Sequence, residues 1–274
     1  MVESRRCVFV GGLHRSGTTP LARAIAGHPQ VSGLSGTGVK EDEGQHLQDV
    51  YPRARQFGGA GRFARDPRAH LTEQSPLVSP ENAQRLWDSW SPYWDLGRPY
   101  VLEKSPPNLI MSRFLQAVFP DSAQIMIIRH PVVVALSTLK WRRLVSRNWQ
   151  NHTSLAQMIE HWVMAHELML ADSVAIRRLH VMRYEDLVAD PVRELAAVQE
   201  LLGLDTSIPG GTLKAVHSVQ YEEHWRQLGS GGWLGRRRRT EIEDRFGDEV
   251  ARFGYDIGDL RGRSGEGLSW SITG

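Results

Sequence analysis

Residues 7–19, CVFVGGLHRSGTT, decide the fold class of this chain. They predict a short apolar strand over residues 7–10, a turn that begins at Gly11 and Gly12, and a helix that starts near Thr18. Glycines allow the backbone to curl so that successive amides point inward, and the helix adds free N–H groups and its positive end. The stretch therefore predicts a loop that binds phosphate or a similar anion. The alternative is a glycine turn capped by threonine, with no ligand.

The loop departs at one position from the pattern of nucleoside-triphosphate enzymes. Its spacing matches G-x-x-x-x-G-K-[ST], but Thr18 stands in place of the lysine, and the basic residue is Arg15. The apolar run over residues 123–128 ends in Arg129 rather than in an acidic magnesium ligand. We therefore expect arginines, and no metal ion, to neutralise the ligand. A kinase-like P-loop phosphotransferase is the alternative that these two positions disfavour.

Elsewhere in the chain, apolar strands alternate with helices. We predict strands over residues 7–10, 99–102, 123–128 and 180–182, and helices over residues 18–28, 80–94, 109–118, 155–176 and 240–253, with another helix that begins at Pro131. This alternation is typical of an α/β fold of three layers, in which helices flank a central, mostly parallel sheet. Residues 32–61 are glycine-rich and polar, as expected of a functional loop. No linker marks a second domain, so we expect residues 1–274 to form a single domain.

The composition excludes several other classes of protein. The chain has 274 residues, of which 41% are hydrophobic and 23% charged, so it is not mainly disordered. A net charge of +2 is too small for a general nucleic-acid coat. The single cysteine, Cys7, excludes an internal disulfide and a cysteine-rich zinc module, and it fits a reducing compartment. No run approaches the roughly 18 apolar residues of a membrane span, and the apolar run near the start is too short for a signal peptide. We therefore expect a cytoplasmic protein with no membrane span.

Several segments, taken in order, match one known family. These are residues 8–34 (VFVGGLHRSGTTPLARAIAGHPQVSGL), Lys104 at the end of a strand, residues 127–137 (IIRHPVVVALS), and residues 183–187 (RYEDL) with the following Asp190-Pro191. Together they resemble the sulfotransferases that use 3′-phosphoadenosine 5′-phosphosulfate (PAPS), through about residue 200. The resemblance implies the P-loop-like sulfotransferase fold and transfer of a sulfuryl group from PAPS to an acceptor hydroxyl. It also implies that adenosine 3′,5′-bisphosphate (PAP) is released as product.

The resemblance also assigns a set of residues to the binding of PAPS. Arg15 and the loop amides would contact the phosphosulfate group. Arg129 and Ser137 would hold the 3′-phosphate, and Tyr184 would lie near the adenine. The full set is Arg15, Ser16, Gly17, Thr18, Thr19, Arg129, Ser137 and Tyr184.

Sulfuryl transfer also needs a cation beside the leaving phosphate and a base near the acceptor hydroxyl. Arg15 and Lys104 suit the first need, although Lys104 is alternatively a solvated lysine at a strand end. Glu43 is our hypothesis for the base and His46 is a close second, because burial can raise the pKa of a glutamate while histidine has the better ordinary pKa. The alternative is that Glu43 and His46 lie in a solvated acidic loop and have no catalytic role.

Two departures from the family pattern bear on the base. Many cytosolic members have a tryptophan where this chain has Pro20, and a histidine base where it has Pro106. The chain is closer to the branch that resembles tyrosylprotein and bacterial sulfotransferases, in which a glutamate after the first helix serves as base. This likeness favours Glu43.

The acceptor and the partners are less well defined by the sequence. Residues 35–73 and 80–94 would shape a site for a small-molecule, carbohydrate or lipid hydroxyl. One arginine of the run 236–239 would close over the 3′-phosphate, or the run is a solvated patch. We expect no nucleic-acid partner, and a homodimer is left open. A nucleotide-binding protein without catalytic activity is the alternative that is not an enzyme.

Overall fold

The structure is a computed structural model. It describes residues 6–145, 153–211, 219–260 and 270–273, with side chains for all of these except 143–145 and 270–273.

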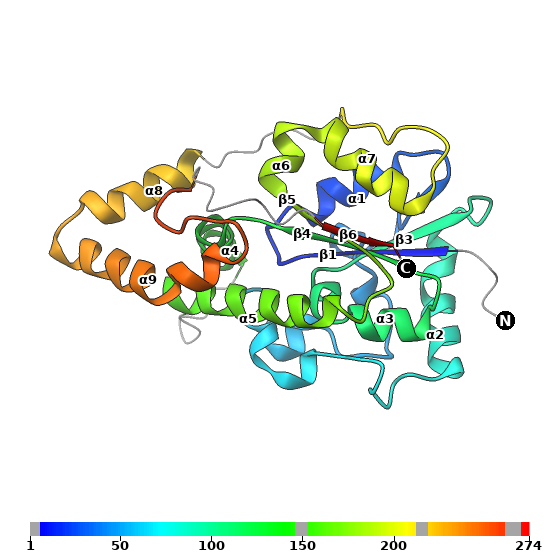
Figure 1. Cartoon of the computed structure of the whole chain (residues 1–274). Helices are drawn as coiled ribbons and strands as arrows, with labels where there is room; N and C mark the ends of the chain where they lie inside the picture. Colours follow the sequence, from blue (N-terminus) through cyan, green and yellow to red (C-terminus); the bar gives the residue numbers. More distant parts are fainter. Residues whose placement is uncertain (1–5, 146–152, 212–218, 261–269, 274) are drawn as a thin grey trace.

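A sheet of six strands in the order β2-β3-β1-β4-β5-β6 forms the middle layer of the molecule (Figure 1). The five strands from β2 to β5 run parallel to their neighbours, and β6 is antiparallel to β5. This confirms the expected mostly parallel sheet. The strands are β1 (Arg6–Gly11), β2 (Val31–Gly33), β3 (Tyr100–Lys104), β4 (Ala123–Ile128), β5 (Arg178–Arg183) and β6 (Trp270–Thr273).

Helices cover both faces of the sheet, as predicted (Figure 1). One face carries α1 (Thr18–Ala26), α6 (Tyr184–Ala189) and α7 (Pro191–Leu202). The other face carries α2 (Pro80–Trp90), α3 (Ser112–Val118), α4 (Pro131–Val145) and α5 (Leu155–Ser173), and α8 (Val219–Ser230) and α9 (Trp233–Ala251) pack onto this side.

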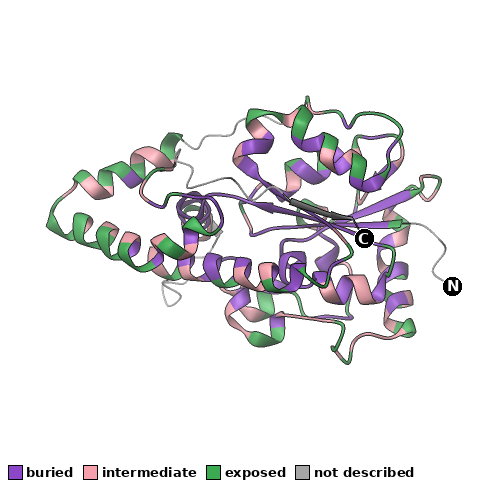
Figure 2. Ribbon diagram, viewed as in Figure 1, coloured by how far each residue is buried: buried purple, intermediate pink, exposed green. Residues whose placement is uncertain are grey.

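Each face of the sheet has its own hydrophobic core, and the buried strands lie between the two cores (Figure 2). In β4, Ile125 and Ile127 belong to the core with α1, whereas Met126 and Ile128 belong to the core with α5. Successive strand residues point to opposite faces, so a strand covered on both sides is mostly apolar, and in β4 Gln124 is the one polar residue. This explains the apolar run over residues 123–128, which coincides with β4.

The long loop after β2 contains short 3₁₀ turns instead of an extended helix. They are η1 (Lys40–Asp42), η2 (Gly44–His46), η3 (Ala54–Phe57), η4 (Phe63–Arg65) and η5 (Pro67–Ala69), and two more, η6 (Ser91–Tyr93) and η7 (Pro106–Ile110), follow later. This agrees with the absence of a periodic pattern over residues 32–61.

The structure differs from the sequence-based expectation at several elements. The helix predicted over residues 109–118 is split into η7 and α3, because Met111 between them has non-helical backbone angles (φ −127°, ψ 8°). The strand predicted over residues 99–102 extends to Lys104, and α9 starts at Trp233 instead of residue 240. Strands β2 and β6 and helices α6, α7 and α8 were not predicted. In α8 only Trp225 is buried, so no apolar stripe revealed it.

Buried histidines make the stability of the fold sensitive to acid. Burial lowers the pKa of His161 to about 3 and that of His166 and His180 to about 4. Since these values lie below the ordinary pKa of about 6.5, the unfolded chain binds more protons and stability is lost as the pH falls from about 6.5 towards 4. We expect a loss of about 2–3 kcal/mol per histidine between pH 7 and pH 4.5.

Urea unfolding at these two pH values measures the effect. The variant His166→Met has one titrating group fewer and should show a shallower decrease in stability than the wild type. Equal slopes for the two proteins would contradict this account of His166.

Candidate active site

The predicted site residues meet at one edge of the sheet, where the parallel strands have their carboxyl ends. Val10 in β1 lies opposite Lys104 in β3, and Gly11 lies opposite Met126 in β4. The next pair along the sheet joins the last residues of β4 and of β5. Ligands in open α/β sheets bind in the crevice outside these ends. The register therefore brings the anion loop, Lys104 and the segments after β4 and β5 to the same edge of the sheet.

The backbone of the loop forms a cradle that only glycine permits at two positions. Gly12 has a φ of +154° and Gly17 a φ of +100°, values that side chains rarely adopt. A Cβ atom at Gly17 would lie 2.5 Å from Cδ2 of Tyr184. The ring of Tyr184 therefore packs directly against the loop.

The start of α1 offers unused hydrogen-bond donors. Gly17 is the N-cap, with no side-chain cap, and the amides of Gly17, Thr18 and Thr19 meet no acceptor in the described part of the chain. The Ser16 hydroxyl is fully buried and also lacks a partner among the described residues. A buried, unpaired hydroxyl costs about 1–3 kcal/mol. These donors fit an anion, so the cradle suits the phosphosulfate group of PAPS.

Basic and polar side chains surround the cradle as the sequence predicted. Arg15, with a φ of +75°, donates from Nε to Oγ of Ser137 at 3.0 Å. Arg129 donates from Nη1 to the carbonyl of Arg15 at 3.1 Å. Its guanidinium lies 4.0 Å from the ring centre of Tyr184. The structure thus brings Arg15, Arg129, Ser137 and Tyr184 together.

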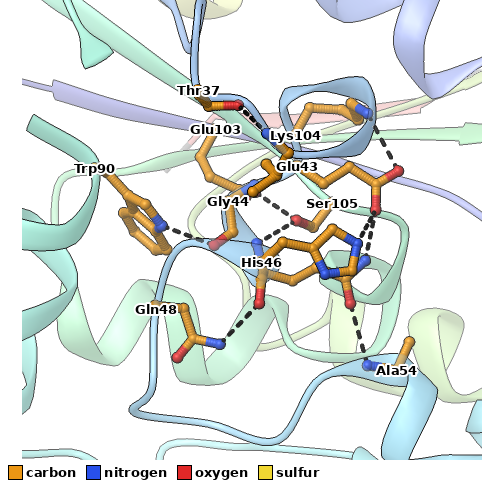
Figure 3. A network of polar contacts seen from close by, with 12 residues as sticks. Thr37, Glu43, Gly44, His46, Gln48, Ala54, Trp90, Glu103, Lys104 and Ser105 are labelled. Carbon is orange, nitrogen blue, oxygen red and sulfur yellow. Dashed lines mark hydrogen bonds and ion pairs between the residues drawn. The ribbon is translucent and has the colours of Figure 1, made fainter. Parts of the chain in front are cut away.

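A second cluster contains the two candidate bases, Glu43 and His46, together with Lys104 (Figure 3). Oε1 of Glu43 lies 3.3 Å from Nζ of Lys104, and both side chains are buried. Oε2 of Glu43 accepts a hydrogen bond from Nε2 of Gln45 at 2.6 Å and lies 3.6 Å from Nε2 of His46. Burial lowers the pKa of His46, and the Glu43 carboxylate partly offsets this. Glu43 and His46 therefore share one site.

His14 connects this cluster with the anion loop. Burial lowers the pKa of His14 to about 4, while the charge of Glu43 raises it and that of Lys104 lowers it further. The backbones are also joined, since the amide of Gly12 donates to the carbonyl of Pro106 at 3.4 Å. The cluster thus lies next to the loop that binds the anion.

Sequence reasoning missed three members of this cluster. Glu103 is buried in β3, and burial raises its pKa to about 7. Ser105 and Gln45 connect it to the loop of Glu43. The sequence carried no signal for Glu103, because burial of β3 along its whole length is seen only in the structure.

The arginine run, residues 236–239, lies within the first turns of α9. Arg237 and Arg239 pair with Glu241 and Glu243 one turn later on the same helix. Arg236 donates to the carbonyl of Gly231. In the structure these three arginines therefore bond to groups of α9 or of the turn before it, in the α8–α9 pair that extends away from the sheet (Figure 1).

Comparison with known proteins places the chain among relatives from mycobacteria. It is 25% identical over 169 residues to the omega-hydroxy-beta-dihydromenaquinone-9 sulfotransferase Stf3 of Mycobacterium bovis. The match covers 58% of this chain and 42% of that protein, and the Stf3 of Mycobacterium tuberculosis gives the same values. The chain thus aligns with less than half of the length of these relatives.

Solved structures share the fold. Sulfotransferase STF9 from Mycobacterium avium has a TM-score of 0.56 at 15% identity, over 96% of this chain and 79% of its own. Sulfotransferase STF1 from Mycobacterium tuberculosis has a TM-score of 0.54 at 19% identity, over 90% of this chain and 78% of its own. Residues 7–207, which include the loop, Lys104, Arg129 and Tyr184, match the model of the sulfotransferase family. The chain therefore belongs to the sulfotransferase family.

Proposed function

We propose that the chain transfers the sulfuryl group of PAPS to the hydroxyl of an acceptor. The observation that carries this proposal is the pairing of two features at one crevice. One is an anion cradle with arginines around it and a buried Ser16 hydroxyl that has no partner among the described residues. The other is the buried contact between Glu43 and Lys104 beside that cradle. Membership of the sulfotransferase family supports the same reaction.

In this proposal the chain holds PAPS at two places. Arg15, the Ser16 hydroxyl and the amides of residues 17–19 bind the phosphosulfate, because several donors converge there. The Ser16 amide, also expected to bind it, instead donates to the carbonyl of Leu13 at 3.0 Å. Arg129 and Ser137 bind the 3′-phosphate, and Tyr184 lies near the adenine. Arginine suits a phosphate since its planar fork makes two parallel charged hydrogen bonds.

The bound co-substrate supplies an activated sulfuryl group, whose bond to the bridging phosphate oxygen breaks as the acceptor oxygen bonds to sulfur. Glu43 takes the proton from the acceptor hydroxyl, and its contact with Lys104 holds it towards the loop. The Lys104 ammonium and Arg15 stabilise negative charge on the leaving phosphate. His46, 3.6 Å from Glu43, is the second candidate for the base.

The acceptor hydroxyl belongs to a small molecule, a carbohydrate or a lipid in this proposal. The relative Stf3 is named for a lipid-like acceptor, an omega-hydroxy menaquinone derivative. The loop over residues 35–73 and helix α2 border the cluster, since Nε1 of Trp90 donates to the carbonyl of Gly44. We propose that these two segments select the acceptor.

We further propose a single domain in the cytoplasm. Residues of β1, β4, α5, α8 and α9 belong to one hydrophobic core, which supports the first point. Cys7 is a free, buried thiol whose pKa burial raises to about 12, and such an unreactive cysteine is compatible with a reducing compartment. Among the helices that the structure describes, none combines the length and the apolar character needed to cross a bilayer.

Turnover with sulfur-labelled PAPS and a panel of phenols, sugars, sterols and hydroxylated quinones tests the function. We expect label to pass to at least one class of acceptor, and we expect the variant Lys104→Met to lose this transfer. Phosphate transfer from ATP with magnesium would favour a kinase. Tight PAP binding without turnover on any acceptor would favour a non-catalytic nucleotide-binding protein.

A further inference from the structure

Glu103 is a buried carboxylate that accepts hydrogen bonds from three residues in two segments of the chain. Its side chain is at the end of β3, and the residue is 1% exposed. Oε1 accepts hydrogen bonds from the amide of Gly44 at 2.9 Å and from the hydroxyl of Ser105 at 2.5 Å. Oε2 accepts from Nδ2 of Asn108 at 2.6 Å. Since it is buried, Glu103 can affect a substrate only through these partners.

One set of partners leads to Glu43 (Figure 3). Gly44 follows Glu43 in the chain, so the bond to its amide holds the backbone beside Glu43. The Ser105 hydroxyl accepts from the amide of Gln45 at 3.0 Å. The side chain of Gln45 in turn donates to Oε2 of Glu43 at 2.6 Å. Glu103 is thus connected to Glu43 through the backbone and through a side chain.

The other partner leads to the anion loop. Nδ2 of Asn108 donates both to Glu103 and to the carbonyl of Val10 at 3.1 Å. Val10 comes directly before the glycines of the loop. Glu103 therefore ties the segment of Glu43 to the strand from which the loop emerges.

The fit around Gly44 leaves little room for movement. A Cβ atom at Gly44 would lie 2.5 Å from Cγ of Glu103. The carbonyl of Gly44 in turn accepts a hydrogen bond from Nε1 of Trp90 at 3.0 Å. The backbone after Glu43 is held from both sides.

We propose that Glu103 is a positioning residue for the transfer reaction: it fixes the Gly44 backbone and so holds Glu43 against Lys104, beside the anion loop. The assignment rests on the proposed function and extends it. Glu43 and Lys104 are separated by 61 positions in the sequence, so their 3.3 Å contact depends on hydrogen bonds that hold the two segments together. Displacements of a catalytic group by about 1 Å can lower rates about 10²-fold.

The variant Glu103→Gln tests the proposal with little change of shape. A glutamine has one acceptor oxygen where the carboxylate has two, so either Gly44 and Ser105 or Asn108 loses its acceptor. We expect kcat to fall about tenfold or more, while the dissociation constant of PAP stays the same. Hydrogen exchange of residues 40–48 should become faster, whereas that of residues 8–26 should not change.

Two further variants separate positioning from a general loss of stability. In Gly44→Ala the added methyl group would collide with the Glu103 side chain and displace it. This variant should therefore show the same loss of kcat at unchanged PAP affinity. Glu194→Gln is the matched control, because Glu194 is a buried glutamate on α7 that pairs with Arg193, and it should keep the wild-type kcat.

Two results would overturn the proposal. One is a wild-type kcat in folded Glu103→Gln, and the other is an equal loss of PAP binding and turnover. If the wild type itself transfers no sulfuryl group, the proposed function fails. In that case unchanged exchange over residues 40–48 in Glu103→Gln would still refute the positioning role.

Discussion

Glu43→Gln is expected to lower kcat about 10²–10⁴-fold, the range that a general base contributes. The glutamine keeps the size of the side chain and can still bond to Gln45 or to Lys104, but it cannot accept the proton of the acceptor hydroxyl. PAP binding should stay close to that of the wild type, since Arg15 and Arg129 lie in the other cluster. Steady-state turnover with a saturating acceptor measures the effect.

Glu41→Gln provides the matched control for this prediction. Glu41 is exposed, lies two positions before Glu43, and pairs with Arg23. The same chemical change there should leave kcat unaltered. If Glu43→Gln turns over normally at every pH and His46→Asn loses activity instead, the base is His46 and our assignment is wrong.

Arg129→Met is expected to weaken PAP binding about 10–100-fold. Hydrogen bonds to charged groups contribute about 1.5–3 kcal/mol each, and Arg129 also bonds to the carbonyl of Arg15 and stacks on Tyr184. Methionine fills a similar volume without the charge. Calorimetric titration with PAP measures the change in affinity.

Arg252→Met controls for the loss of one positive charge. Arg252 is exposed after α9 and pairs with Glu167, so PAP affinity should not change in this variant. Equal PAP affinity in Arg129→Met and the wild type would remove Arg129 from the proposed site.

Local patterns predicted the central part of the fold well. The strand over residues 123–128 has the predicted bounds because both of its faces are buried, which requires an apolar run. The anion loop could be recognised because a strand, a pair of glycines and a helix start follow one another within residues 7–19. Arg15, Arg129, Ser137 and Tyr184 were expected at one place, and the structure brings them together.

Contacts between distant segments could not be predicted in the same way. The contact of Glu43 with Lys104 depends on the register of β3 against β1 and on the path of an irregular loop. Glu103 escaped notice because a charged residue beside Lys104 resembles an exposed strand end until burial is known. The choice between Glu43 and His46 stays a prediction for kinetics, since the two side chains lie 3.6 Å apart.

Calorimetry with PAP and with ATP, each in the presence and absence of magnesium, tests the central claim most directly. The glycine cradle has threonine where triphosphate enzymes have lysine, and Arg15 and Arg129 lie around it. This arrangement predicts saturable binding of PAP that does not depend on magnesium, and weaker binding of ATP. Strong, magnesium-dependent uptake of ATP together with no binding of PAP would contradict it.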